Sequence, residues 1–467
     1  MSENPIASLA AITGGGWLVG GAVRDRLLRR PTGDYDVVLD GPVEPAARAL
    51  AKRARAFAFE LSEGFGAWRV TARDRSWQLD LLPLGGDTIE ADLARRDLTI
   101  NAIAEPLAGD GYVDPFGGVG DLEARRLRMV STDAFAADPL RTLRLARLAC
   151  ELDFDVEAET ADRARASAPE LVSVAAERVF AEFRRIVIAD RVLAGLRQMD
   201  SLGATAAVLP ELARLRGVEQ SPYHHLDVYD HTQAVLAAAV ELERDSQGWA
   251  GEHAEAVVGV LAEPLANELT RGQGLRLAAL LHDIAKPQTR DVTSEGRITF
   301  MGHDAAGAQV TTSVLGRLRA SEKLSEHVAA LTRNHLRLGF LVHEVPLSRR
   351  DVYRYLRTCE PVEVDVTVLS VADRLATRGR GAERAIGRHL SLARELVGDA
   401  LAWRARRPKP PLRGDELAEA VGLVPGPELG RVLGELEEAS FAGEICSRQQ
   451  AIERARELLE GRATADH

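Results

Sequence analysis

Two aspartates separated by one residue carry the first chemical signal of this sequence. Asp34 and Asp36 lie in the β-rich run GDYDVVLD. Alternate side chains of a strand point to the same side, so both carboxylates are expected on one face. Carboxylate oxygens suit Mg²⁺, which would bridge an attacking hydroxyl and a nucleotide triphosphate. Asp80, in WQLDLLPL, is expected to add a third catalytic carboxylate from a neighbouring strand.

A glycine turn precedes these aspartates by about a dozen residues. Gly20 and Gly21 end a short apolar run and begin a helix-like stretch. Two glycines let the backbone approach a phosphate, and the following helix presents its first N–H groups to that anion. Arg24, one helical turn further on, adds a charge-assisted contact. Each motif alone is common in turns and solvated strand ends, but their order and spacing together predict a triphosphate site.

A second set of residues has the character of metal ligands. Imidazole and carboxylate groups suit a divalent transition metal that keeps open positions for water. The long gaps between them are expected when ligands come from separate helices of a bundle. Histidines 224, 225 and 343 are expected at the surface or at helix caps instead. The predicted ligands are His231, His282, Asp283 and Asp373, with His303 and His335 as further candidates and Lys286 as a phosphate contact.

The elements that must position these residues change along the chain. Residues 16–40 are predicted to form a strand, a turn, a helix and a strand, and residues 67–84 two strands joined by a polar turn. From about residue 120 onward, helical periodicity dominates. The prediction is an α+β protein, with a mixed sheet and helices at the N-terminus and an all-helical body after it. Glycine- and proline-rich punctuation predicts boundaries at 114–121, 202–225 and 406–414.

Length and charge limit the possible classes of protein. The 467 residues exceed one core, which predicts two to four domains. The net charge of −11, from 59 basic and 70 acidic residues, argues by itself against a nucleic-acid partner. The distribution matters more than the sum, because arginines cluster between 141 and 191. A locally basic groove on an acidic protein is therefore compatible with the sequence.

Cysteines and apolar runs indicate the compartment. Cys150, Cys359 and Cys446 lie far apart and form no CxxC pair, so no disulfide framework is expected. The first residues, MSENPIASLAAI, have neither the basic start nor the full apolar core of a signal peptide. No apolar run is long enough to span a bilayer. We expect a cytoplasmic protein without a membrane partner.

The first 200 residues resemble a known family. They contain, in the family's order, LVGGAVRD, GDYDVVL, RRDLTINAIAEPL (95–107), DPFGGVGDLEARRLRMV (114–130) and DPLRTLRLARLACELDFDVE (138–157). These strings are similar to the class II tRNA nucleotidyltransferases and the related bacterial poly(A) polymerases. The resemblance implies a polymerase-beta-like nucleotidyltransferase head (palm) over residues 1–130. It further implies a helical neck with the base-recognition domain over residues 131–215.

The resemblance also assigns roles to residues of the head. Its glycine turn and triphosphate arginine fall on Gly21 and Arg24, and its metal carboxylates on Asp34 and Asp36. Its RRD motif implies that an Asp–Arg pair senses the ribose 2′-hydroxyl. Acceptor and donor groups of that kind select for a ribonucleotide. The RRD motif falls on Arg95, Arg96 and Asp97, with Asn101 after it.

The base-reading motif of the family falls on Asp138 and Arg141. An acceptor and a donor fork imitate a Watson–Crick partner, so the protein rather than a template would choose C or A. Arg144 and Arg147 follow at i+3 spacing and would meet phosphates. The alternative for this stretch is an amphipathic helix with a solvated arginine face.

Two positions depart from the family pattern. The residue before Asp138 is Ala137, where the family usually has an acidic residue. Only residues 85–89 separate the strand of Asp80 from EADLARRD, where CCA-adding relatives generally have a longer flexible loop. CC-adding relatives have a reduced loop at this point. The short connection therefore favours a CC-adding enzyme as the nearest alternative.

The second set of ligands resembles a different superfamily. LLHDIAKP is similar to the HD superfamily of metal-dependent phosphohydrolases, whose core ligands fall on His231, His282, Asp283 and Asp373. His303 and His335 resemble the extra ligands of two-metal members. The resemblance implies an HD domain over residues 222–385. Residues 386–467 resemble the helical tails of HD-containing tRNA nucleotidyltransferases, which implies tRNA binding.

Together these observations predict a template-independent tRNA nucleotidyltransferase that adds the terminal CCA from CTP and ATP. The expected partner is the 3′ end and acceptor arm of tRNA rather than DNA, and Mg²⁺ is the expected ion of the head. A poly(A) polymerase is disfavoured, because that family usually has a strongly basic C-terminal extension and this tail is acidic. An alternative of another class is an HD phosphohydrolase with the head as an RNA-binding module. It would require idle carboxylates at Asp34 and Asp36.

Overall fold

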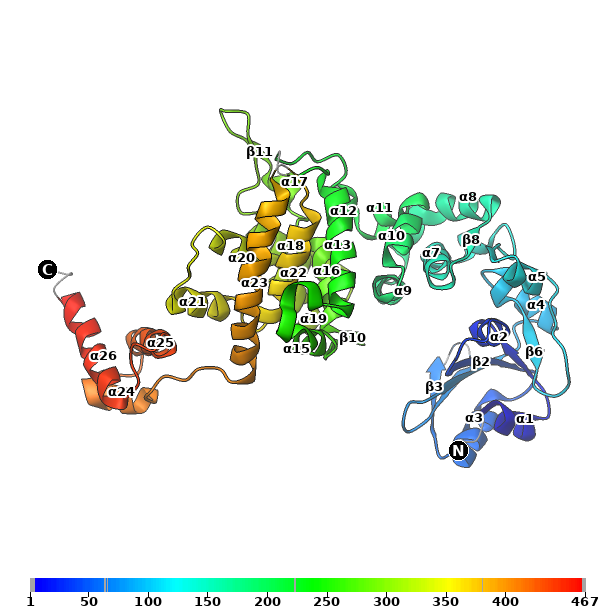
Figure 1. Ribbon diagram of the computed structural model, residues 1–467. Helices are drawn as coiled ribbons and strands as arrows, with labels where there is room; N and C mark the ends of the chain where they lie inside the picture. The colour runs from blue at the N-terminus through cyan, green and yellow to red at the C-terminus, as the bar shows by residue number, and fades with distance from the viewer. Residues whose placement is uncertain (1–4, 63, 65, 222–223, 380, 464–467) are drawn as a thin grey trace. The chain divides into compact units, whose positions relative to one another are not determined.

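A six-stranded mixed sheet organises the N-terminal part of the computed structural model (Figure 1). The strand order is β3-β4-β5-β2-β1-β6, and only the β2–β5 pair is parallel. This sheet, followed by a helical body, confirms the predicted α+β class. The strands are β1 (Trp17–Val19), β2 (Asp34–Leu39), β3 (Phe57–Ser62), β4 (Ala67–Thr71), β5 (Gln78–Pro83) and β6 (Ala104–Pro106).

The two faces of this sheet differ because the strands alternate in polarity. On one face, Val37, Val70 and Leu79 are fully buried, and helix α3 (Val43–Ala54) packs against β4 and β5 there. Burial of each such side chain stabilises the fold by about 1.5–3 kcal/mol. Helix α1 (Pro5–Thr13) packs on α3. The opposite face has the charged positions of the same strands, so the alternation itself separates the core from the candidate site.

Helices and short turns complete the first of two compact units, Met1–Val208. Helix α7 packs against α9 and α10, and its central residues are buried. The remaining elements of this unit are α2 (Gly21–Leu27), α4 (Ile89–Leu93), η1 (Thr99–Asn101), α5 (Gly118–Glu123), β7 (Arg126–Leu127), α6 (Ala134–Ala137), α7 (Leu140–Leu152), β8 (Asp155–Val156), α8 (Ala158–Ser167), η2 (Ala168–Ser173), α9 (Ala176–Ile188), α10 (Val192–Ser201) and α11 (Ala204–Val208).

The second unit, Leu209–His467, is a helical bundle with a helical tail. Helix α13 packs against α16 and α22, and α18 packs against α19. Its helices are α12 (Pro210–Ala213), α13 (Val228–Arg244), α14 (Gln247–Ala250), η3 (Gly251–His253), α15 (Ala254–Leu261), α16 (Arg271–Leu281), α17 (Lys286–Thr289), α18 (His303–Arg317), α19 (Glu322–Asn334), α20 (Arg337–Leu341), α21 (Arg349–Cys359), α22 (Glu363–Ala376), α23 (Ala382–Ala405), α24 (Gly414–Val421), α25 (Pro427–Phe441) and α26 (Arg448–Ala463).

Short two-stranded ribbons interrupt this helical part. Strands β9 (Pro264–Ala266) and β10 (Leu269–Thr270) pair across Asn267 and Glu268, both of which have positive φ. Such a turn fits the twist of an antiparallel pair, and periodicity alone does not indicate it. Strands β11 (Asp291–Val292) and β12 (Ile298–Thr299) form the other ribbon of this unit.

The structure describes residues 5–62, 64, 66–221, 224–379 and 381–463. Within them no helix is both long and apolar enough to cross a membrane. All three cysteines are free thiols, two of them buried and Cys446 exposed. The residues between α23 and α24 form neither helix nor strand, as the prolines of that segment require.

Candidate active site and metal centre

The predicted carboxylates lie in one row across the polar face of the sheet. Asp36 of β2 is directly opposite Asp80 of the parallel strand β5, and residues opposite each other share a face. Arg69 of β4 comes next in the row and donates from Nε and Nη2 to Asp80 at 2.6 and 2.7 Å. Asp34 is opposite Gln78, whose amide donates to Asp34 Oδ1 at 2.9 Å. Asp80 thus has a cationic partner within the protein, whereas Asp34 and Asp36 face each other's charge.

The environment of Asp36 fits a cation. Burial, with repulsion from Asp34, raises the pKa of Asp36 from 3.8 to about 6, although Arg96 and Arg69 oppose this. A carboxyl group that resists ionisation beside two other carboxylates is stabilised by a bound positive ion. All-oxygen donors are the set that Mg²⁺ prefers. These residues fit the expected ion on the chemistry of their donors.

The glycine turn lies beside Asp36. Gly20 has φ +70, a conformation that L side chains rarely adopt. A Cβ atom there would lie 3.1 Å from Arg96 Nη1 and 3.2 Å from Asp36 Oδ2. The backbone conformation therefore favours glycine, and a Cβ atom would in addition crowd the ends of these two side chains. Gly21 starts α2 directly after it. The backbone at Gly20 therefore lies next to Asp36, and the predicted approach of a phosphate to this turn stays a prediction.

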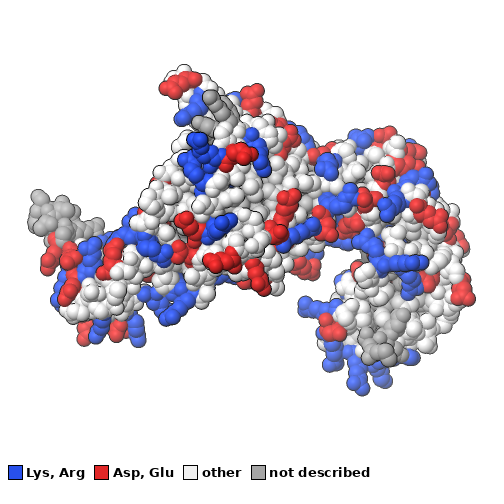
Figure 2. Space-filling model, viewed as in Figure 1, with Lys and Arg blue, Asp and Glu red and all other residues white. Residues whose placement is uncertain are grey.

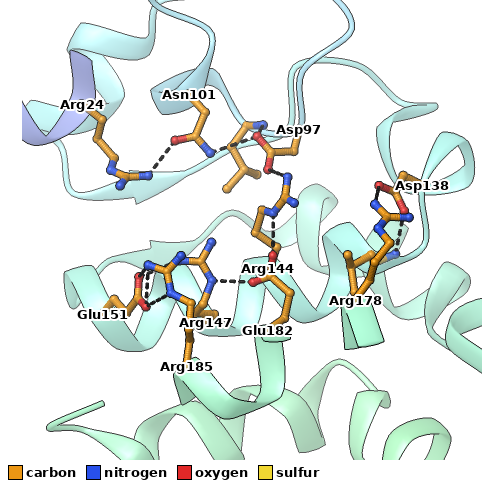
Figure 3. A network of polar contacts seen from close by, with 12 residues as sticks. Arg24, Asp97, Asn101, Asp138, Arg144, Arg147, Glu151, Arg178, Glu182 and Arg185 are labelled. Atoms are coloured by element: carbon orange, nitrogen blue, oxygen red, sulfur yellow. Dashed lines mark hydrogen bonds and ion pairs between the residues drawn. The ribbon is translucent and has the colours of Figure 1, made fainter. Parts of the chain in front are cut away.

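Arg24 points from α2 into a polar network that Figure 3 shows. Its Nη1 donates to Asn101 Oδ1 at 2.8 Å, and Asn101 Nδ2 donates to Asp97 Oδ1 at 3.0 Å. Arg144 Nη1 donates to the other oxygen, Oδ2, at 3.1 Å. Burial would raise the pKa of Asp97, but Arg144 and the hydrogen bonds from Asn101 and Leu98 hold it below the ordinary value. Asp97 is therefore ionised, and its position depends on Asn101 of η1 and on Arg144 of α7.

Arg144 and Arg147 lie on α7 and both contact carboxylates (Figure 3), although the Arg144 side chain is also 33% exposed. Arg144 Nε donates to Glu182 Oε1 at 3.0 Å, and Arg147 Nε donates to Glu182 Oε2 at 2.5 Å. Arg147 Nη1 also donates to Glu151 at 2.6 Å, and its side chain is 7% exposed. A phosphate at Arg147 would have to displace these carboxylates. The predicted phosphate contacts stay predictions.

The predicted base-reading pair is also held by the protein. Arg141 donates to the carbonyl oxygens of Arg95 at 2.7 Å, Arg96 at 3.2 Å and Ala134 at 3.1 Å. Three of its five N–H donors are thereby engaged, which leaves two for a ligand. Asp138 accepts from Arg178 Nη2 at 2.8 Å. The side chain of Arg95 itself is exposed.

Sequence reasoning missed several members of this site. Arg69, Gln78, Arg178 and Glu182 each pair with a predicted residue across a gap of at least 11 positions. For Arg69 and Gln78, a signal existed, because alternation along β4 and β5 places them on the polar face. No local pattern indicates Glu182, because its partners lie on a different helix.

The second unit brings the predicted histidine and aspartate ligands together from separate helices. His231 lies in the first turns of α13, which Asp227 caps by accepting from the Asp230 amide. His282 and Asp283 follow α16, which begins with a capping box of Thr270 and Gln273. Local capping signals thus set the starts of two of the helices. Asp373 comes from α22, His303 from the start of α18 and His335 from the end of α19.

Asp283 is common to two groups of candidate ligands. Its Oδ2 lies 3.1 Å from His282 Nε2 and 3.8 Å from His231 Nε2. Its Oδ1 lies 3.3 Å from His303 Nε2 and 3.8 Å from His335 Nε2. Each group holds three buried ligand atoms within 4.8 Å of one another. Asp373 Oδ1 lies 3.0 Å from His231 Nε2, next to the group that contains His231 and His282.

Hydrogen bonds fix the orientation of these rings. Nδ1 of His282, His303 and His335 lies 2.9, 2.7 and 2.6 Å from a backbone carbonyl oxygen of its own helix region. An N–H at Nδ1 leaves the Nε2 lone pair directed at Asp283, as in metal-bound histidines. Burial, with the neighbouring His282, lowers the pKa of His335 to about 4, so this ring is neutral.

Buried atoms without partners support a metal at this centre. His231 Nε2, His282 Nε2 and Asp283 Oδ1 are buried, and although each lies close to another candidate ligand, none of these contacts has the geometry of a hydrogen bond. Buried polar atoms are costly to leave unsatisfied, and a divalent ion would satisfy all three. The donor set of imidazole and carboxylate fits a transition metal. The described residues therefore contain a candidate metal centre with two groups of ligand atoms that share Asp283.

Two further residues border this centre. Lys286 Nζ lies 2.7 Å from Asp283 Oδ2 and 2.6 Å from Gln220 Oε1. His224, which sequence reasoning assigns to the surface or a cap, is half-buried with its ring centroid 5.3 Å from that of His231. Burial and the charge of Lys286 lower the pKa of His224 to about 4. Only the fold brings this residue of a loop to the ligands.

Three models of protein families match the chain. A model described as the head domain of poly(A) polymerase matches residues 16–83 and 68–128. One described as the probable RNA and SrmB-binding site of polymerase A matches residues 153–215. A model of the HD domain matches residues 228–378. The matched segments contain both the carboxylate row and the histidine centre.

Curated proteins resemble the chain over nearly its whole length. An A-adding tRNA nucleotidyltransferase of Deinococcus radiodurans is 37% identical over 94% of each chain. A CC-adding tRNA nucleotidyltransferase of Thermus thermophilus is 35% identical over 93% of this chain and 91% of its own. A multifunctional CCA protein of Halorhodospira halophila is 36% identical over 68% of this chain and 72% of its own.

Solved structures share the fold. A Thermotoga maritima CCA-adding enzyme in complex with tRNA superposes with a TM-score of 0.60 at 18% identity, covering 97% of this chain and 94% of its own. A CCA-adding enzyme in complex with ATP gives a TM-score of 0.64 at 18% identity with the same coverage. At this identity the likeness concerns architecture alone.

Proposed function

The chain belongs to the tRNA nucleotidyltransferase family, and we propose that it adds the 3′-terminal CCA of tRNA from CTP and ATP without a nucleic-acid template. The observation that carries this proposal is the row of Asp34, Asp36 and Asp80 on one sheet face, beside the glycine turn at Gly20. The alternative of an idle head is disfavoured, because the raised pKa of Asp36 has no structural benefit without a cation.

In the proposed reaction the 3′-hydroxyl of tRNA attacks the α-phosphate of the nucleotide, and pyrophosphate leaves. Asp34 and Asp36 would hold Mg²⁺, which supplies charge neutralisation at the phosphates and a lowered pKa at the attacking hydroxyl when bound. Backbone N–H groups after Gly20 and the guanidinium of Arg24 would orient the triphosphate. Catalysis then rests chiefly on positioning and electrostatics.

The network around Asp97 supports selection of a ribose. Oδ1 accepts from Leu98 N and from Asn101, and Oδ2 accepts from Arg144. A carboxylate offers about four acceptor positions, so one remains at Oδ2 for a ribose hydroxyl. We assign Asp97 this role, with Asn101 and Arg144 as its positioning residues.

Base selection is assigned to Asp138 and Arg141. Cytosine and adenine both place an amino donor beside a ring-nitrogen acceptor, whereas uracil and guanine place a carbonyl acceptor beside an N–H donor. A carboxylate acceptor with a guanidinium donor therefore pairs with C and A and leaves unsatisfied groups against U and G. The two N–H donors that Arg141 retains after its contacts with backbone carbonyls are enough for this task.

The second candidate function is the addition of only part of the CCA sequence. The connection between β5 and α4 is short, and the relatives that match end to end include CC-adding and A-adding enzymes. A protein that adds only CC, or only the terminal A, would need a partner enzyme. The short connection favours the CC-adding form of this alternative.

One assay separates these functions. Purified protein with Mg²⁺ is incubated with tRNA that lacks CCA, CA or only A, with CTP, ATP or both, and products are resolved at single-nucleotide length. Completion of the CCA end on all three substrates supports the proposal. A stop after CC, or extension only of tRNA ending in CC, establishes the corresponding partial enzyme. Failure to extend any substrate contradicts the nucleotidyltransferase proposal.

For the second unit we propose a metal-dependent phosphohydrolase centre that acts on 2′,3′-cyclic phosphates or nucleotides. The two ligand groups that share Asp283, with Lys286 adjacent, support this activity. Metal content tests it when it is measured together with two reactions, the opening of 2′,3′-cyclic nucleotides to monophosphates and the release of phosphate from mononucleotides. Protein that contains its metal but catalyses neither reaction would leave this unit with a structural role.

We propose that each of the four predicted segments has its own function. Residues 1–130 form the transferase head, 131–215 the neck that reads the base, 222–385 the HD domain and 386–467 a tail that binds tRNA. The tail has its own apolar cluster, including Leu417, Leu436 and Ala455, which supports a separate function. The free thiols fit a reducing cytoplasm, where tRNA and nucleotides are available.

A further inference from the structure

The polar row of the sheet continues beyond the carboxylates to a free edge. Arg69, which pairs with Asp80, is directly opposite Phe59 of β3. Because residues opposite each other share a face, Asp36, Asp80, Arg69 and Phe59 lie in one line across four strands. Strand β3 is the outermost strand on this side, and Figure 1 shows its position.

A second line runs parallel to the first. Asp34 is opposite Gln78, Gln78 is opposite Thr71, and Thr71 is opposite Phe57. Phe57 and Phe59 are two positions apart on β3, so their rings lie on the same face as the carboxylates. The candidate active-site face therefore ends in two adjacent aromatic side chains.

These rings are unusually exposed. Phe57 is 57% and Phe59 is 47% accessible to solvent. A single exposed apolar residue is ordinary, but neighbouring aromatic rings on an edge strand promote aggregation unless they have a function. Arg73 lies over the Phe57 ring, with its guanidinium carbon 5.4 Å from the ring centroid. Arg55 is exposed two residues before the strand. Aromatic rings with cations beside them are the arrangement that binds single-stranded nucleic acid.

We propose that Phe57 and Phe59 form a stacking platform for the last bases of the unpaired 3′ end of the RNA primer. This inference rests on the proposed nucleotidyltransferase function and names a further primer-binding surface for it. Stacking on aromatic rings is independent of sequence, as a primer whose last base changes with each addition requires. Arg55 and Arg73 meet the phosphates of the same nucleotides.

The spacing of the strands fits this role. Strands lie about 4.8 Å apart, so Phe59 is three strand spacings, or roughly 14 Å, from Asp36. Stacked nucleotides rise about 3.4 Å each along a strand. This distance corresponds to about four stacked nucleotides and to fewer in an extended strand, so the platform would hold bases just upstream of the terminal nucleotide. A base there would hold the primer while its terminal hydroxyl lies at Asp36.

A second copy of this chain is the competing occupant of an exposed edge. Pairing of two β3 strands would use backbone groups and bury the same rings. Two observations favour RNA: the rings continue the line of the carboxylates, and the cation of Arg73 lies over the Phe57 ring. Sedimentation of wild-type protein over a range of concentrations tests the alternative.

The experiment uses the full-length protein with Phe57→Ala and Phe59→Ala combined. We expect KM for a tRNA primer to rise about tenfold, because a lost stacking contact has this order of effect. KM for CTP should change less than about twofold, since the platform does not contact the incoming nucleotide. Glu60→Ala is the matched control, because it is on the same strand with its side chain on the opposite face. Phe59→Trp in an otherwise wild-type chain should keep the wild-type KM for primer.

A binding measurement makes the result independent of turnover. Tryptophan fluorescence of the Phe59→Trp variant should be quenched by a short single-stranded RNA ending in CC and not by a blunt duplex. Extension by the wild type with an unchanged primer KM in the double alanine variant would overturn the platform and leave the transferase function standing. A concentration-dependent dimer that the alanine substitutions abolish, without loss of primer affinity, would also overturn it. No extension by the wild type would remove the function on which it rests.

Discussion

Arg144 Nη1 donates a hydrogen bond to Asp97 Oδ2 at 3.1 Å and joins positions 47 residues apart. Arg144 lies on α7 of the predicted neck, whereas Asp97 lies in the RRD segment of the predicted head. The same guanidinium contacts Glu182 of α9. Asp97 is therefore positioned by a helix that belongs to a different predicted segment.

This contact predicts the effect of Arg144→Gln on the choice of sugar. Loss of a charge-assisted hydrogen bond leaves Asp97 less fixed and raises its pKa toward the ordinary value. The ratio of kcat/KM for CTP over dCTP should fall about tenfold, since such a bond contributes roughly 1.5–3 kcal/mol. Arg163→Gln, at an exposed arginine of α8, should leave the ratio unchanged. An unaltered ratio in Arg144→Gln would contradict a positioning role.

Glu182→Gln should destabilise the first unit in a manner that depends on pH. Burial opposes ionisation, but Arg147 and Arg144 hold the pKa of Glu182 below 4.5. Its stabilising contribution is therefore complete above pH 4.5 and is lost as pH falls through the folded-state pKa. The variant leaves two arginines without this partner, at a cost of roughly 3 kcal/mol. Denaturant unfolding from about pH 3 to 8 should show a deficit that narrows as the pH falls below 4.5. A deficit constant with pH would contradict this account.

Asp36→Asn should raise the thermal stability of the protein and lower its activity. The folded-state pKa of about 6 exceeds the ordinary 3.8, so stability from this group is complete below 3.8 and is lost as pH rises through about 6. Without metal at pH 8 the variant should melt several degrees above the wild type. Nucleotide addition should fall more than about a hundredfold, because a metal ligand is removed. Lower melting together with lost activity would indicate damage to the fold instead.

The histidine centre should lose metal in a pattern set by its geometry. Wild-type protein should contain about two ions per chain. His231→Ala removes a ligand from one group and His335→Ala from the other, whereas Asp283→Ala removes the ligand that both groups use. Elemental analysis should show about one ion per chain in each histidine variant and almost none in Asp283→Ala. Primer extension with CTP should persist in all three variants, which separates the two activities. One ion in wild-type protein would contradict the shared ligand.

The sequence alone determined the features that depend on local pattern. Alternation in GDYDVVLD and WQLDLLPL separates a buried from a polar face, so the strands and the shared face of the candidate carboxylates could be predicted together. The turn at Gly20 could be predicted because glycine is the residue that most readily adopts a positive φ, and Gly20 has one. Likeness of whole motifs to known families indicated the ligands in the helical body, since each lies near a recognisable helix end.

Only the tertiary structure decided which side chains meet across the chain. Glu182 and His224 carry no local signal of their partners, because those partners lie on other elements that are distant in the sequence. The pairing of β3 with β4 decided that Phe57 and Phe59 share the carboxylate face. A shift by one residue would have turned both rings to the opposite side. The register of the strands and the packing of the helices depend on the whole fold, and they determined which side chains border the candidate site.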